Sequence, residues 1–90
     1  MYQRALQEYE KALGLGHTST LYTLHSLGNL YFKQDKLGEA EEMYQRTVQG
    51  YEKALGPDHT STLGTVHYLG ELYTKQGKLG EAEEMYQRAL

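Results

Sequence analysis

The chain has 90 residues, which is enough for one small domain with a modest buried core. It has no cysteine, so disulfides and thiolate metal sites are excluded and a reducing, cytoplasmic location is favoured. The net charge is −3, with acidic and basic residues interleaved, whereas duplex nucleic acid calls for clustered Lys and Arg, so no nucleic-acid partner is expected. No stretch approaches the ~18 consecutive apolar residues of a membrane span, so no membrane partner is expected either.

The chain begins and ends on the hexapeptide MYQRAL, at Met1–Leu6 and Met85–Leu90, and a near copy lies at Met43–Val48. The copies are 42 residues apart, and residues 1–48 laid over residues 43–90 give 35 identities in 48 positions. A fixed period of this length is typical of solenoid proteins. We therefore interpret the chain as two periods of one repeat, with both ends falling inside that repeat.

Two helix types alternate along the chain. A partial long helix is expected over 1–13, a short helix over 19–34, and a full long helix over 37–55. In the long helix the apolar positions step by three and four, which is typical of one helical face. That face comprises Leu37, Ala40, Tyr44, Thr47, Val48, Tyr51 and Leu55. Gly56 suits a left-handed residue just past the helix end, and Pro57 cannot continue the helix.

The second short helix is expected over 61–76, with Ser or Thr at 60–62 capping its start. Its apolar stripe comprises Leu63, Val66, Leu69, Gly70 and Tyr73. A partial long helix over 79–90 follows. Gly28 and Gly70 lie in the middle of the short helices, where Gly costs about 1 kcal/mol relative to Ala. We therefore predict close packing there, against Ala40 and Ala82 of the following long helices.

This order of elements predicts an all-α fold, namely an α-solenoid of antiparallel helix pairs in a single array over residues 1–90. The stretches LGNLYFKQDKLGEAEEMYQRTV (Leu27–Val48) and LGELYTKQGKLGEAEEMYQRAL (Leu69–Leu90) resemble the tetratricopeptide repeat. The family's Leu-Gly pair, first-helix Tyr, small Ala and following aromatic match residues in both copies. These residues are Leu27, Gly28, Tyr31, Ala40 and Tyr44 in the first copy and Leu69, Gly70, Tyr73, Ala82 and Tyr86 in the second.

The 42-residue unit and the stretch ALGPDHTSTL are similar to the kinesin-light-chain subtype and to arrays in fungal and bacterial nucleotide-binding signalling receptors. The resemblance implies a right-handed superhelix whose short helices line a concave groove that binds a protein or peptide, without catalysis and without a cofactor.

The expected groove is the face of the short helices on which the two copies diverge most. It comprises Tyr22, His25, Ser26, Asn29, Phe32 and Lys33 from the first copy and His67, Tyr68, Glu71 and Lys75 from the second. Exposed rings beside amide and cationic groups suit an extended peptide. Two interpretations stay open: each repeat presents different chemistry to one ligand, or the copies have drifted on a solvated face.

Catalytic and metal sites are not expected. His25 and His67 occupy equivalent positions, but no third ligand stands at metal-site spacing. His17 and His59 lie at helix-entry turns, where local hydrogen bonding is expected. Adjacent carboxylates such as Glu83 and Glu84 point about 100° apart on a helix and are interpreted as surface residues.

Both ends lack a polar capping helix, which repeat proteins normally need for solubility. We therefore expect the chain to be a piece of a longer array that associates end to end, as stacked or helix-swapped copies. The residues expected at the uncovered ends are Tyr2, Leu6, Tyr9, Leu13, Tyr86 and Leu90. The alternatives to a groove ligand are a structural spacer or self-assembling unit, and RNA binding by helical repeats, which a pI of 5.7 disfavours.

Overall fold

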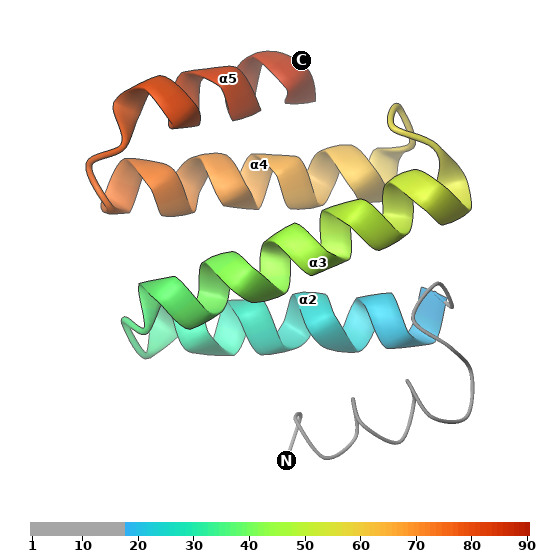
Figure 1. Ribbon diagram of the computed structural model, residues 1–90, viewed down its shortest axis with the longest axis horizontal. Coiled ribbons are helices and arrows are strands. Elements are labelled where there is room, and N and C mark those ends of the chain that lie inside the picture. The colour runs from blue at the N-terminus through green and yellow to red at the C-terminus, as the bar shows by residue number, and fades with distance from the viewer. Residues whose placement is uncertain (1–17) are drawn as a thin grey trace.

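The computed structural model describes residues 18–90 and is all-α over that range. The described helices are α2 (Thr18–Lys33), α3 (Leu37–Leu55), α4 (Thr60–Lys75) and α5 (Leu79–Ala89). Each helix runs antiparallel to the one before it, and the stack grows in one direction from α2 to α5 (Figure 1). The predicted all-α solenoid class is confirmed. The expected helix over 1–13, with Tyr2, Leu6, Tyr9 and Leu13, lies outside the described residues, as does His17.

The residue that caps the start of α4 differs from the predicted one. The predicted cap within 60–62 is wrong, because the N-cap is His59, whose Nδ1 accepts a hydrogen bond from the Ser61 backbone N–H at 3.1 Å. Thr62 instead donates its hydroxyl to the Gly56 carbonyl at 2.9 Å and so closes the turn that precedes the helix. The local hydrogen bonding expected for His59 is thus confirmed.

The turns use three residues with positive φ. Asp35 (φ 64°) and Gly77 (φ 78°) occupy the same repeat position and reverse the chain after each short helix. Gly56 ends α3 with φ 97° and ψ 157°, which is a conformation that essentially only glycine adopts, rather than the left-handed helical one expected. Its N–H still bonds the Glu52 carbonyl, so the last turn of α3 is closed.

The buried stripe on α3 is wider than the single face predicted. Ala40, Tyr44, Thr47, Val48 and Tyr51 are buried as expected. Met43 and Gly50 are buried too, whereas Leu37 is half-buried and Leu55 is 37% exposed. The physical reason is that α3 packs against α2 on one side and α4 on the other, so two adjoining faces are covered.

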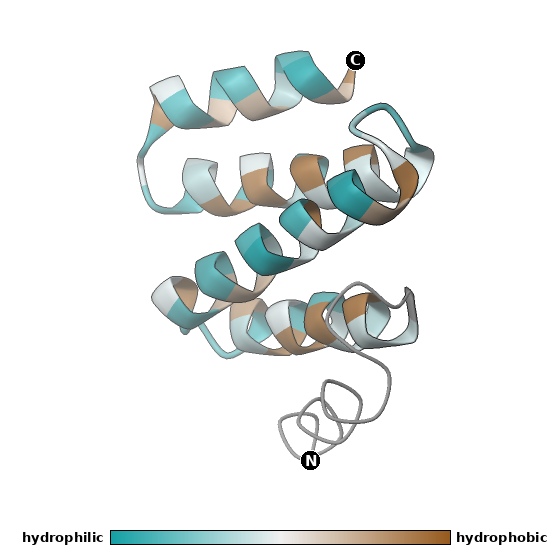
Figure 2. Cartoon of the chain, turned by 45° about the vertical axis from the view of Figure 1, so that its right-hand side comes forward, coloured by the Kyte–Doolittle hydropathy of each residue, from teal (hydrophilic) through white to brown (hydrophobic). Residues whose placement is uncertain are grey.

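The same holds for α4, which lies between α3 and α5 (Figure 1). Its predicted stripe is buried except for Leu63, which is half-buried, and Thr62, Thr65 and Leu72 are buried in addition. Hydrophobic residues are concentrated in α2 and α4, whereas α3 and α5 carry more hydrophilic surface (Figure 2). The described apolar core is nonetheless shared, because seven of its buried residues lie in α2 and α4 and six lie in α3 and α5.

The mid-helix glycines do pack closely, but against tyrosine rings rather than against Ala40 and Ala82. A Cβ built on Gly28 would lie 2.8 Å from both Cδ1 and Cε1 of Tyr44, and one on Gly70 would lie 2.8 Å from Cε1 of Tyr86. The prediction named the wrong partner. The aromatic ring of each long helix is seated directly on the glycine of its own short helix.

This contact predicts that Gly28→Ala destabilises the fold. The added methyl meets a ring that is 1% exposed, and such overpacking costs roughly 1–3 kcal/mol, offset by about 1 kcal/mol of helix propensity. We expect a net loss of about 1 kcal/mol in the free energy of unfolding, measured by urea titration followed by circular dichroism. The matched control is Gly64→Ala, because that helical glycine has no atom within 4 Å of a built Cβ and should gain stability. Equal effects of the two substitutions would contradict the contact.

Candidate functional site

A pocket of about 240 Å³ opens where α2, α3 and α4 meet. Its lining residues come from all three helices and are Asn29, Phe32, Lys33, Tyr44, Tyr68 and Glu71. Five of them belong to the groove set predicted from sequence. Tyr44 was missed because it lies on the long helix, although the glycine at position 28 was a signal that a neighbouring ring could approach the short helix closely.

Stacked rings form the floor of this pocket. Tyr44 is buried, and its hydroxyl donates a hydrogen bond to Oδ1 of Asn29 at 2.5 Å. The Tyr68 ring stacks over it, with centroids 6.0 Å apart and planes inclined by 23°. Burial raises the pKa of Tyr44, and the neighbouring Tyr68 and Glu71 add to that rise, so the phenol stays protonated and remains a donor. The same hydrogen bond fixes the orientation of the Asn29 side-chain amide at the pocket.

His25 lies beside the pocket but faces the helix interface. Its ring centroid is 5.0 Å from that of Tyr68 in an edge-on arrangement and 5.8 Å from that of Tyr44. Its Nδ1 lies 3.3 Å from Oγ1 of Thr65 on α4. Burial lowers the pKa of His25, which favours the neutral ring. His25 therefore makes a contact that joins α2 to α4, and its expected role in contacting a ligand stays a prediction.

The charged residues at the rim differ in what they contact. Lys33 is exposed and lines both this pocket and an adjoining one of about 200 Å³ formed with Ser26, Asn29 and Leu30. Lys75 is held by Asp35, with 3.3 Å between Nζ and Oδ1, and its Nζ lies 5.3 Å from the centroid of the Phe32 ring. Lys75 therefore ties α4 to the end of α2.

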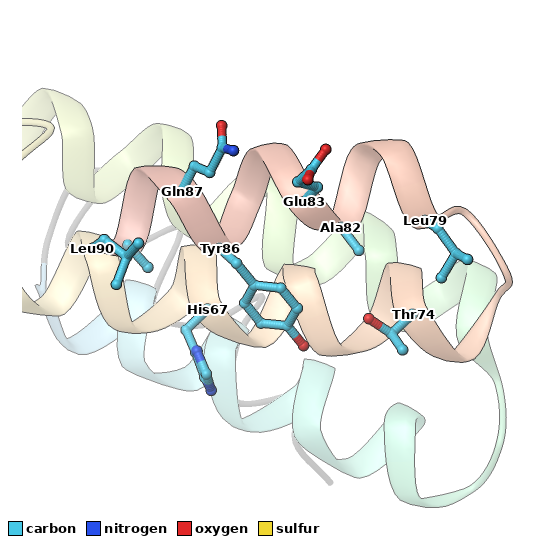
Figure 3. A pocket seen from close by; sticks show the side chains of 9 residues that line it. His67, Thr74, Leu79, Ala82, Glu83, Tyr86, Gln87 and Leu90 are labelled. Carbon is cyan, nitrogen blue, oxygen red and sulfur yellow. The ribbon is translucent and has the colours of Figure 1, made fainter.

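Two further predicted groove residues lie away from this pocket. Tyr22 is 67% exposed. Burial raises the pKa of Tyr51 on α3, and Tyr22 adds to that rise. His67 lies 3.5 Å from Glu71 through Nε2 and Oε1, and its ring centroid is 5.5 Å from that of Tyr86. It lines a second pocket, of about 600 Å³, between α4 and α5 (Figure 3).

The antiparallel pairs, the 42-residue period and the aromatic seated on glycine in both copies describe one repeated unit. A family model of the tetratricopeptide repeat matches residues 1–53 and again residues 23–90, which together cover the chain. The chain belongs to the tetratricopeptide-repeat family. Such repeats generally mediate protein–protein interaction, as non-enzymatic scaffolds. A search of curated proteins finds no match to this chain.

Over residues 18–90, no three His, Asp or Glu side chains converge as metal ligands would. None of the described helices combines the length and the apolar character needed to cross a membrane.

The hydrogen bond under the pocket floor predicts that Tyr44→Phe lowers the free energy of unfolding by about 1 kcal/mol, because the ring packing stays while one hydrogen bond is lost. Tyr86→Phe is the matched control, because within residues 18–90 the Tyr86 hydroxyl makes no hydrogen bond equivalent to that of Tyr44 with Asn29. Chemical unfolding of both variants measures the difference. A loss at Tyr86 as large as that at Tyr44 would show that the bond to Asn29 is not the cause.

The partial burial of His25 predicts a pH dependence of stability. Its folded-state pKa is lowered, so the unfolded chain binds the proton more readily, and stability is complete above the unfolded value near 6.5 and falls as the pH drops below it. We expect the urea midpoint of His25→Gln to fall less between about pH 7 and pH 5 than that of the wild type. The difference should correspond to the uptake of less than one proton per molecule on unfolding. His67→Gln is the control, because this histidine lies outside the contacts that His25 makes with Tyr44, Tyr68 and Thr65. An unchanged slope in His25→Gln would contradict the assignment.

Proposed function

We propose that the chain is a non-catalytic binding module that holds a protein or extended peptide in the concave groove of α2 and α4, over the pocket floored by Tyr44 and Tyr68. The observation that carries this proposal is the convergence of five groove residues, chosen from sequence alone, with one buried ring. Stacked rings offer apolar area at low entropic cost, and the rim supplies an amide donor, a cation and a carboxylate.

The arrangement favours an extended main chain over a compact small molecule. The pocket of about 240 Å³ is smaller than the roughly 300–1,000 Å³ typical of small-molecule sites, and it continues into the shallow pocket beside Ser26. A peptide lying along both pockets would place a backbone carbonyl against the Asn29 amide nitrogen and side chains against Tyr68 and Phe32. Lys33 and Glu71 would select the charges of the segments on either side.

We further propose that the repeats are of the kinesin-light-chain type, which the 42-residue period supports, and that the protein works in the cytoplasm, which the absence of cysteine supports. The second candidate function is structural, as a spacer or self-associating unit without a groove ligand. It is favoured by the uncovered face of α5, where Leu79 is 67% exposed and Leu90 fully exposed.

The groove proposal predicts that Tyr68→Ser weakens peptide binding by about tenfold, the effect of removing one aromatic anchor. The repeat accommodates serine at this position, because Ser26 occupies it in the first repeat, although the stacking of Tyr68 on Tyr44 is lost. The probe is the strongest binder from a phage-displayed random-peptide library selected on the full chain, measured by fluorescence anisotropy. Glu42→Ala, on the exposed outer side of α3, should leave affinity unchanged.

Amide chemical shifts recorded with the same peptide add a map of the bound surface. Perturbations confined to α2 and α4 around the pocket support the proposal. A library that yields no binder, or a binder that is insensitive to Tyr68→Ser and perturbs another face, would overturn it.

A further inference from the structure

The face of α5 that lines the pocket of about 600 Å³ is nearly identical in sequence to a face of α3 that another helix of the chain covers. Residues 79–90 differ from residues 37–48 at only two positions, which are Thr47/Ala89 and Val48/Leu90. On α3 this face is packed against α4. On α5 it lines the pocket of about 600 Å³, with the Tyr86 ring lying over α4 and with Leu79 and Leu90 near its two ends (Figure 3).

Burial differs accordingly between equivalent side chains. Val48 is 6% exposed, whereas Leu90 is fully exposed. Tyr44 is 1% exposed, whereas Tyr86, which has no stacked partner equivalent to Tyr68 within the described chain, is only half-buried. The α3–α4 contact thus shows which kind of helix the α5 face accepts, namely a short helix of this repeat.

The chain carries a second helix of that kind, and one of its core positions is uncovered. α2 and α4 are the same element in the two repeats, and Leu30 of α2 corresponds to Leu72 of α4. Leu72 is fully buried between α3 and α5, but Leu30 is 36% exposed. The C-terminal half of α2 therefore presents part of the surface that α4 uses against α3.

The polar contacts of the α3–α4 interface involve residues that recur in the sequence on α5 and at the end of α2. Glu41 accepts a hydrogen bond from Gln76 Nε2 at 3.3 Å and lies 3.7 Å from Lys78 Nζ. Gln45 donates to the Tyr73 hydroxyl at 3.1 Å. The residues at the equivalent positions are identical: Glu83 and Gln87 on α5, and Tyr31, Gln34 and Lys36 at the end of α2. Glu83, Gln87, Gln34 and Lys36 are exposed.

We propose that a second copy of this chain binds the α5 face through its α2 helix, in the register that α4 adopts on α3. Leu30 of the second copy then approaches the face that Leu79 and Tyr86 border, and its Lys36 pairs with Glu83. The contact is heterologous, because two different surfaces meet, so it extends into longer assemblies unless it closes into a ring. The α5 side of this contact lies outside the peptide groove, whereas Leu30 of α2 also borders the shallow pocket beside Ser26. The proposal does not rest on the groove proposal.

Sedimentation velocity over a broad micromolar to millimolar range tests this proposal, with circular dichroism to verify that each variant remains helical. The wild-type chain is expected to associate as concentration rises. Glu83→Lys and Lys36→Glu should each raise the dissociation constant of self-association by about fivefold, and the double variant should restore it, because the pair is then reversed. Glu84→Lys, with the same charge change on a neighbouring face of α5, is the control and should associate like the wild type.

The possible results distinguish the proposed α2-on-α5 contact from self-association through other surfaces. A monomer at every concentration overturns the proposal. Association that is insensitive to both charge reversals, or a double variant weaker than either single one, overturns the α2-on-α5 register. Because Tyr68→Ser acts on the peptide groove, its association should match that of the wild type, so failure of the groove proposal and failure of this one are distinguishable.

Discussion

The rest of the structure depends on one contact, in which a tyrosine ring packs directly against a helical glycine. In each repeat the missing Cβ of Gly28 or Gly70 lets the ring of Tyr44 or Tyr86 approach the short-helix backbone. The long helix can then lie close against the short one, and the ring reaches through to line a pocket. The same glycine therefore allows the close approach of the two helices and gives the pocket an aromatic wall.

The side chains that cover each tyrosine ring come from the following repeat rather than from the repeat that contains the ring. Tyr44 is covered by Tyr68 from α4 and bonded to Asn29, so it becomes a rigid, buried platform. Tyr86 packs on Gly70 in the same way, but within residues 18–90 no ring from a following helix stacks on it, and it lines an open pocket instead. This is the nearest-neighbour behaviour of a solenoid, in which each interface is completed by the adjacent unit.

The sequence predicted the helices and their order because both depend on local signals, namely apolar spacing, turn residues and the Gly-Pro stop. It also predicted most of the pocket lining, since a helical wheel places those side chains on one face. It could not predict that Thr62, Thr65 and Leu72 are buried, because a stripe derived for one interface misses the second side of a helix that lies between two others. The His59 cap was missed for a related reason: Ser and Thr are the usual caps, and the choice of His59 depends on the path of the turn.

The contacts made by the divergent positions bear on why the copies differ. If the face that carries these positions were merely solvated, Asn29, Phe32 and Tyr68 would have few neighbours, and their replacement would have little consequence. Instead Asn29 accepts the Tyr44 hydroxyl, Phe32 lies under the Lys75 ammonium and Tyr68 stacks on Tyr44. Each of these contacts crosses between helices, so a substitution at any of them alters both the packing and the pocket. Drift without constraint is therefore a poor account of such positions, because they take part in the packing between helices. That each repeat presents its own chemistry to one ligand stays a prediction.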